Sequence, residues 1–247
     1  MNSLIITIDL DWACEAAIEE TLDFFRDKKV SPTVFTTHNS KVVEACLNEM
    51  DVGLHPFFGE NSSHGSSIAE VVNTVMDLPH NFQAFRCHRY GICNLSRQAM
   101  VDAGMRISSN VCTNLEIIRP FQDRCGLLEV PIFLEDGGYL WQKHPLEITP
   151  HFQAALNNPG AKVLVIHPMH FAINTPCFSY MYDIKQSISR QDWNQMDTSL
   201  LNKLRWTGRG IRDFIIDLLD LVPETMSLKS LYHAVLKQRD LPSLLPE

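Results

Sequence analysis

Short apolar segments alternate with longer amphipathic segments along the 247-residue chain, and this alternation restricts the fold more than any other feature. Ser3–Leu10, Thr33–His38 and Val52–His55 are predicted strands, and Cys14–Lys29 and Lys41–Met50 are the predicted helices between them. Strand–helix alternation over one domain length implies parallel strands joined by right-handed crossovers. The pattern predicts an α/β fold, either a barrel or an open doubly wound sheet.

The alternation continues through the rest of the chain. The further predicted strands are Phe82–His88, Arg106–Asn110, Leu127–Leu134 and Lys162–His167, and the further predicted helices are Ile68–Leu78, Ser96–Gly104, Ile211–Val222 and Leu228–Gln238. Long irregular stretches in a compact domain are usually functional, and three are predicted: Phe57–Ser66, Val111–Gly126 and Asn174–Asp197. We expect one domain over residues 1–247, with a helical C-terminal extension from about residue 197.

Composition excludes several classes of protein. The 21 basic and 29 acidic residues give a net charge of −8, which disfavours nucleic acid and anionic membranes as partners. Seven cysteines without a Cys-x-x-Cys pair argue against a disulfide framework and a zinc finger. The N-terminal segment has no basic residues before its apolar run, and Asp9 interrupts that run early, so it does not match a signal peptide; no apolar run reaches the length of a membrane span. We therefore expect a cytoplasmic protein.

Polar side chains occupy the C-terminal ends of the predicted strands. They are Asp9 and Asp11, His38, His55, Arg86 and His88, Glu135 and Asp136, and His167 and His170. Because parallel α/β folds build their sites at this edge of the sheet, we expect these side chains to form one site.

Asp9 and Asp11 are two residues apart at the end of a strand. Their side chains point to the same face, with Cα atoms about 6–7 Å apart. Two carboxylates this close repel each other unless a cation lies between them. A metal ion bound by one carboxylate, with the other acting as a base, removes this repulsion. The alternative is that Asp11 caps the following helix.

Histidines complete a candidate metal site. His55 leads through a loop rich in glycine and serine to His64, and an Asp-His-His set leaves positions open for water and substrate. The alternative is that both histidines are structural. His167 ends the most apolar strand, where a histidine suits a general acid for a leaving amine.

Five segments resemble the conserved motifs of the polysaccharide deacetylases (carbohydrate esterase family four, the chitooligosaccharide deacetylase homology domain). These segments are Thr7–Trp12, Val52–Pro56, Arg86–His88, Glu129–Asp136 and Val165–His170. Their order and spacing are similar to the family's over about Leu4–Asn174. Thr37–Ser40, Ser62–Gly65 and the His-Pro-x-His at residues 167–170 resemble the WbmS-like branch associated with lipopolysaccharide O-antigen.

The resemblance implies a distorted seven-stranded (β/α) barrel that holds one divalent metal ion, with zinc as the default. It implies Asp11, His55 and His64 as ligands. The main family spaces its two ligand histidines four residues apart, whereas here His64 follows His55 by nine. His38 is therefore an alternative third ligand.

The resemblance also implies the catalytic roles. Asp9 would be the base, Arg86 would orient Asp9, His167 would be the acid, and Asp136 would support His167. Three histidines are candidates for alternative ligands or for residues that contact the ligands: His38, His88 and His170. His88 takes the place of the family's usual proline.

We expect a metal-dependent hydrolase that removes an N-acyl group, in the default case acetyl, from a sugar in surface polysaccharide or lipopolysaccharide biosynthesis. The sugar could be linked to a nucleotide or a lipid. One alternative is a metal-dependent hydrolase of a non-sugar amide, and another is a degenerate barrel that serves as a binding or scaffold subunit. Loss of carboxylates and histidines from the strand ends would favour the degenerate barrel, and they are present.

Two further features suggest contacts with the substrate. Arg209 and Arg212 flank the start of a predicted helix, where they could bind the phosphates of a sugar carrier; the alternative is that they pair with nearby aspartates. The stretch Asn174–Asp197 could form a lid, because aromatic faces pack on sugar rings. Its aromatic residues are Phe178, Tyr180, Tyr182 and Trp193.

Overall fold

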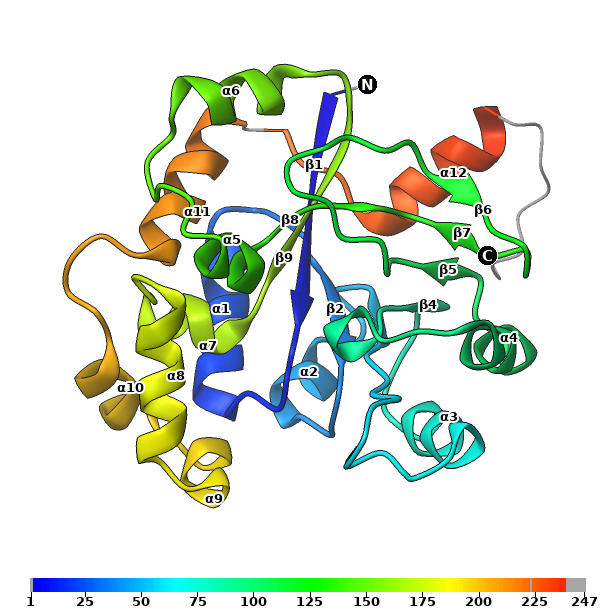
Figure 1. Cartoon of the computed structure of the whole chain (residues 1–247), viewed down its shortest axis with the longest axis horizontal. Helices are drawn as coiled ribbons and strands as arrows, with labels where there is room; N and C mark the ends of the chain where they lie inside the picture. Colours follow the sequence, from blue (N-terminus) through cyan, green and yellow to red (C-terminus); the bar gives the residue numbers. More distant parts are fainter. Residues whose placement is uncertain (1, 223, 239–247) are drawn as a thin grey trace.

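A curled sheet of nine strands forms the centre of the protein, which a computed structural model describes over residues 2–222 and 224–238 (Figure 1). The strands are β1 (Asn2–Asp9), β2 (Thr33–Thr36), β3 (Val52–Leu54), β4 (Ala84–Phe85), β5 (Ile107–Ser108), β6 (Phe121–Gln122), β7 (Leu128–Glu129), β8 (Ile132–Glu135) and β9 (Gly160–Ile166). Their order is β6-β7-β5-β4-β3-β2-β1-β9-β8, and every pairing is parallel except that of β6 with β7. The α/β prediction is confirmed.

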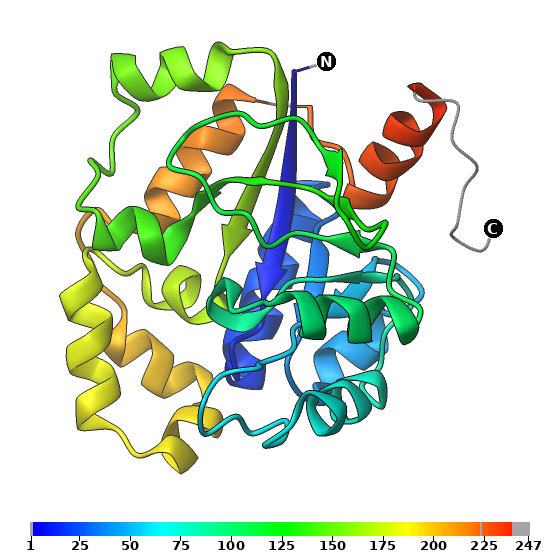
Figure 2. The ribbon, with the colours of Figure 1, turned by 45° about the vertical axis from the view of Figure 1, so that its right-hand side comes forward.

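Helices cover the sheet and connect its strands (Figure 2). They are α1 (Glu15–Asp27), α2 (Lys41–Cys46), α3 (Ile68–Met76), α4 (Asn94–Asp102), α5 (Asp136–Trp141), α6 (Pro150–Asn157), α7 (Pro168–Ile173), α8 (Phe178–Ser187), α9 (Arg190–Asn194), α10 (Thr198–Leu204), α11 (Ile211–Leu221) and α12 (Leu228–Gln238). A short 3-10 helix spans His88–Tyr90. Within the described ranges, no helix has the length and apolar character needed to cross a membrane.

The central strand β1 separates two apolar cores, because its side chains alternate between the faces of the sheet. Ile6 and Ile8 pack in the outer core, together with α1, α7 and α11. Ile5 packs in the inner core, which α12 covers near the start of the strand. Farther along the inner face, Thr7 and then Asp9 replace apolar residues, so the inner face becomes polar at its carboxyl end.

The predicted strand Leu127–Leu134 is in fact two strands. Val130 and Pro131 separate β7, which pairs with β5, from β8, which pairs with β9. Proline lacks the N–H that a ladder requires, so the strand changes partners there. The edge strands of the sheet are β6 and β8, and in the described part of the chain no ladder joins them to close a barrel. The hydrogen bond from Thr113 N–H to Ile132 C=O links β8 to the segment between β5 and β6. The observed sheet is a curled half-barrel, and the seven-stranded barrel is not reproduced as predicted.

Two local predictions need correction. Asn174–Asp197, expected to be irregular, contains α8 and α9. The helix predicted to begin at Ser96 begins at Asn94, so Ser96 lies inside α4; its hydroxyl accepts from the N–H of Cys93, the residue that precedes the helix.

Candidate active site

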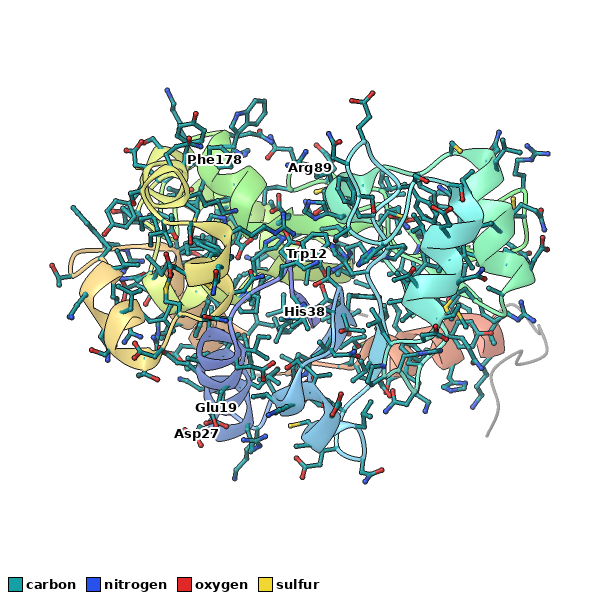
Figure 3. The ribbon with its side chains drawn as sticks, turned by 90° about the horizontal axis from the view of Figure 1, so that it is seen from below. Trp12, Glu19, Asp27, His38, Arg89 and Phe178 are labelled. Atoms are coloured by element: carbon teal, nitrogen blue, oxygen red, sulfur yellow. The ribbon has the colours of Figure 1, made fainter. Side chains whose placement is uncertain are left out.

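The carboxyl ends of the parallel strands meet at one edge of the sheet and surround a cavity of about 1050 Å³. Figure 3 looks onto this edge, with Trp12 near the centre, Arg89 above it and Phe178 to the upper left. Asp9, His55 and His167 line the cavity. This placement follows from the topology, because parallel strands direct their carboxyl ends to the same side.

Arg86 holds the Asp9 carboxylate in a fixed position. Both side chains are buried, and Arg86 Nη1 donates to Asp9 Oδ1 over 2.7 Å and to Thr7 Oγ1 over 2.9 Å. The other guanidinium nitrogens donate to the backbone carbonyl and the hydroxyl of Ser109. Every guanidinium nitrogen is thus engaged, and the Asp9 Oδ2 atom is left facing His55 Nδ1 at 3.7 Å.

Asp11, His55 and His88 form a tight group. Asp11 Oδ1 lies 3.0 Å from His55 Nε2 and 3.0 Å from His88 Nδ1. One ligand atom from each residue lies within 4.8 Å of the other two. His55 is buried, and although its ring nitrogens face the carboxylates of Asp9 and Asp11, neither nitrogen makes a well-oriented hydrogen bond among the described residues. A buried nitrogen without such a bond is costly and calls for a ligand.

The geometry of this group fits a divalent metal ion. Ligand atoms about 2.0–2.2 Å from a tetrahedral ion lie roughly 3.3–3.6 Å apart, and Asp11 Oδ1 lies 3.0 Å from a nitrogen of each histidine, so a small adjustment would admit an ion. An ion there would also satisfy a buried His55 nitrogen. Asp11, His55 and His88 are therefore the residues best placed to hold a metal.

His167 lies next to this group, on the side of β9. Its Nδ1 is 2.5 Å from Asp136 Oδ1, and its backbone N–H donates to Asp136 Oδ2 over 2.7 Å. Its Nε2 is 3.5 Å from Asp11 Oδ2. Burial opposes charge on the imidazole, but the Asp136 and Asp11 carboxylates outweigh it and raise the pKa of His167 well above its ordinary value. The ring therefore carries a proton at neutral pH.

Glu135 and Asp136 could form a second ligand group with His167, but their hydrogen bonds assign them other roles. Asp136 binds His167 twice, and the Glu135 carboxylate accepts from the N–H groups of Gly137 and Gly138 at the start of α5. A Cβ at Gly137 would lie 2.6 Å from Glu135 Oε1, so this cap requires glycine. Burial, partly offset by the charge of His167, raises the pKa of Glu135 to about 7.

The structure does not bring His64 or His38 into the Asp11 group. His64 Nδ1 accepts from Phe57 N–H over 3.1 Å, and His64 Nε2 donates to Thr37 C=O over 2.7 Å. Both ring nitrogens of His64 are thus occupied by backbone groups. His38 Nδ1 lies 2.8 Å from Thr37 Oγ1, and His38 does not line the cavity.

His170 lies beside His167, with ring centroids 5.9 Å apart, and its Nδ1 is 3.2 Å from Thr175 Oγ1. Burial lowers the pKa of His170 to about 4, so this ring is neutral near pH 7. It lines the cavity without joining either ligand group.

The arginines expected to bind an anion pair with carboxylates instead. Arg209 binds Asp217 and also donates to Leu146 C=O, and Arg212 binds Glu20. Neither arginine lines the cavity. The phosphate site predicted at the start of α11 therefore receives no support from the structure, because both arginines already pair with carboxylates.

Two pairs of consecutive residues at the cavity adopt the left-handed backbone region. Asp11 and Trp12 have φ of 46° and 53°, and Arg89 and Tyr90 have φ of 56° and 55°. Residues other than glycine are strained there, at a cost of about 1–3 kcal/mol each. The strained turns direct Asp11 and the neighbouring His88 toward each other, and Trp12 packs against His88 with ring centroids 5.2 Å apart.

Helices α8 and α9 form one wall of the cavity. Phe178 and Trp193 line the cavity, in agreement with the prediction that aromatic residues of Asn174–Asp197 face the substrate. The two tyrosines do not: the Tyr180 hydroxyl donates to Leu204 C=O, and Tyr182 is exposed outside the cavity.

Some lining residues carried no recognisable signal in the sequence. Trp141, Lys185 and Arg190 reach the cavity from helices that were not predicted. Glu135 had one signal, its place at a strand end, but its N-cap role depends on two glycines that follow it.

Comparisons with known proteins came to the same family. The model of the family described as "WbmS-like: Polysaccharide deacetylase" matches residues 6–185. A crystal structure from Bordetella bronchiseptica, WbmS, described as a polysaccharide deacetylase involved in O-antigen biosynthesis, has a similar fold, with a TM-score of 0.77, 22% identity and coverage of 89% of this chain and 90% of the other. A crystal structure from Mycobacterium smegmatis, described as a polysaccharide deacetylase, has a TM-score of 0.56 and 12% identity. The match covers 98% of this chain and 92% of the other. No curated protein sequence matched.

Proposed function

The chain belongs to the WbmS-like family of polysaccharide deacetylases, and from this premise we propose that it is a metal-dependent hydrolase of N-acylated sugars. The reaction would remove an acyl group, in the default case acetyl, from the sugar nitrogen during the synthesis of a surface polysaccharide or lipopolysaccharide. The observation that carries the proposal is the buried His55 ring, which contacts the carboxylate of Asp11 without a well-oriented hydrogen bond, beside a His167 whose pKa is raised.

We propose Asp11, His55 and His88 as the ligands of one divalent ion, with zinc as the default for a set of one carboxylate and two imidazoles. The distances of 3.0 Å from Asp11 Oδ1 to a nitrogen of each histidine, and the absence of a well-oriented hydrogen bond at either nitrogen of the buried His55, support this set. When bound, the ion would polarise the acyl carbonyl and the attacking water. His64 is not part of the proposed set, because backbone groups occupy both its nitrogens.

Asp9 is the proposed general base. Arg86 engages one carboxylate oxygen and keeps the side chain from rotating, which leaves the second oxygen to accept a proton from water. The Arg86 guanidinium, 2.7 Å from Asp9 Oδ1, also compensates the charge of this buried carboxylate.

His167 is the proposed general acid. Asp136 holds its Nδ1 side, so Nε2 faces the cavity and can donate its proton to the departing amine. The raised pKa of His167 keeps this proton in place at neutral pH. Asp136 therefore binds both the backbone N–H and the ring of His167, which fixes the orientation of the ring.

Metal analysis and an acetate-release assay test the proposal together. We expect about one divalent ion per chain after purification, and acetate release from N-acetylated sugars that stops on chelation and returns with zinc. A chain that binds no divalent metal would refute the hydrolase and favour a degenerate barrel. Metal-dependent release of acyl groups only from non-sugar amides would refute the sugar substrate alone.

A further inference from the structure

Three cationic side chains line the cavity without a carboxylate partner among the described residues: Arg89, Lys185 and Arg190. They come from different walls, since Arg89 lies in the turn after β4 whereas Lys185 and Arg190 belong to α8 and α9. Arg86, which lies behind the Asp9 carboxylate, is fully paired by contrast. Cations gathered at one cavity of a chain with net charge −8 require an explanation.

Each of these cations lies over an aromatic ring of the same cavity. The distances from the charged group to the ring centroid are 6.0 Å for Arg89 over Phe57, 5.2 Å for Lys185 over Trp193 and 5.8 Å for Arg190 over Trp12. Such a contact positions the charged group through the face of the ring and uses none of its N–H donors. The donors therefore remain available to a ligand.

The charges of the cavity favour an anion near these side chains. Partial loss of hydration lowers the pKa of Lys185, the charge of Asp11 raises it, and the charge of Arg89 lowers it again. The repulsion between Lys185 and Arg89 is the smallest of these effects, and an anion bound by both side chains would offset it. The lining carboxylates Asp9, Asp11 and Glu135 all lie at the sheet edge.

We propose that the cavity accepts an N-acylated sugar that carries a negative charge, and that Arg89, Lys185 and Arg190 bind its anionic group. This inference rests on the proposed function, because it takes the cavity as the sugar site. A carboxylate on the sugar ring and a phosphate on carbon 1 share the required chemistry, since guanidinium groups bind both through paired hydrogen bonds. A cavity of about 1050 Å³ has room for such a substituent beside the ring.

Binding to an inactive protein tests the inference separately from turnover. In metal-loaded Asp9→Asn protein, dissociation constants are measured by calorimetry for N-acetylglucosamine, N-acetylglucosaminuronic acid and N-acetylglucosamine 1-phosphate. We expect at least one anionic sugar to bind about tenfold or more tightly than the neutral one, because charge-assisted hydrogen bonds are the strong ones. The tighter of the two anionic arms identifies the carboxylate or the phosphate as the group recognised.

The same measurement on a cavity variant, Arg89→Gln, Lys185→Gln and Arg190→Gln, should abolish this preference and leave the neutral sugar within about threefold. The matched control is Arg119→Gln, Arg124→Gln and Lys203→Gln, which removes the same charge from exposed positions outside the cavity and should keep the preference.

Equal binding of neutral and anionic sugars by the Asp9→Asn protein would overturn the inference, as would equal loss in both triple variants. Acetate release by the wild-type protein is scored separately. An anion preference without any acetate release would refute the proposed hydrolase and leave anion recognition standing. Release from neutral sugars without an anion preference would do the reverse.

Discussion

We expect His88 to be a metal ligand and His64 to be a structural residue, and alanine variants of the two histidines distinguish these roles. His88 Nδ1 contacts Asp11 in the candidate metal group, whereas His64 bridges Phe57 N–H and Thr37 C=O. We therefore expect His88→Ala to weaken metal binding with little loss of stability. We expect His64→Ala to lose stability and to retain the metal.

The magnitudes follow from the contacts. A zinc site held by four ligands contributes about 10–16 kcal/mol, or roughly 2.5–4 kcal/mol per ligand, so His88→Ala should raise the metal dissociation constant about 100- to 1000-fold. His64→Ala removes two hydrogen bonds to the backbone, each with a net contribution of about 0.5–1.5 kcal/mol. The expected loss in the free energy of unfolding is thus roughly 1–3 kcal/mol.

Competition with a chromophoric chelator measures the metal dissociation constant, and urea unfolding of the metal-free proteins measures stability. Using metal-free protein for the stability measurement keeps bound metal from contributing to it. If His88→Ala binds metal as tightly as the wild type while His64→Ala loses it, the ligand assignment drawn from the structure is wrong, and the set suggested by the sequence resemblance is restored.

Three further predictions concern catalysis. Asp9→Asn should lower kcat at least about 100-fold with metal still bound, since the base is lost; a loss below tenfold would argue against that role. Asp136→Asn should lower the pKa of His167, so the needed proton is lost at a lower pH and the alkaline limb of the kcat/KM profile should move to lower pH; an unmoved limb would exclude His167 as the acid. Phe178→Ala should raise KM for sugar substrates several-fold, whereas the exposed Tyr182→Ala should leave KM unchanged; equal effects would argue against a sugar-binding wall.

The general position of the site could be predicted from the sequence, because it depends only on strand order and direction. Asp9, His55, Arg86 and His167 each follow a short apolar strand, and parallel pairing brings such residues to one edge. The exact extent of the sheet could not be predicted in the same way. Pro131 divides one apolar run into two strands with different partners. The apolar pattern of that run is the same whether it forms one strand or two, so the pattern could not reveal the division.

The identity of the third candidate ligand depended on local backbone conformation. The left-handed conformation of Arg89 and Tyr90 accompanies the turn that brings His88 to Asp11, and no spacing rule for histidines contains this information. The pairing of Arg212 was equally inaccessible, because its partner Glu20 is 192 residues away in the sequence.

The strained turns at Asp11–Trp12 and Arg89–Tyr90 have a consequence for engineering this protein. Glycine adopts the left-handed region without steric cost, so substitutions at Trp12 or Arg89 could raise the melting temperature while removing side chains that line the cavity. A library selected for thermal stability alone would therefore accumulate changes at the catalytic edge, which is where natural proteins commonly exchange stability for activity. Positions of α1 and α11 that pack in the outer core offer no such conflict, since no residue of these helices lines the cavity.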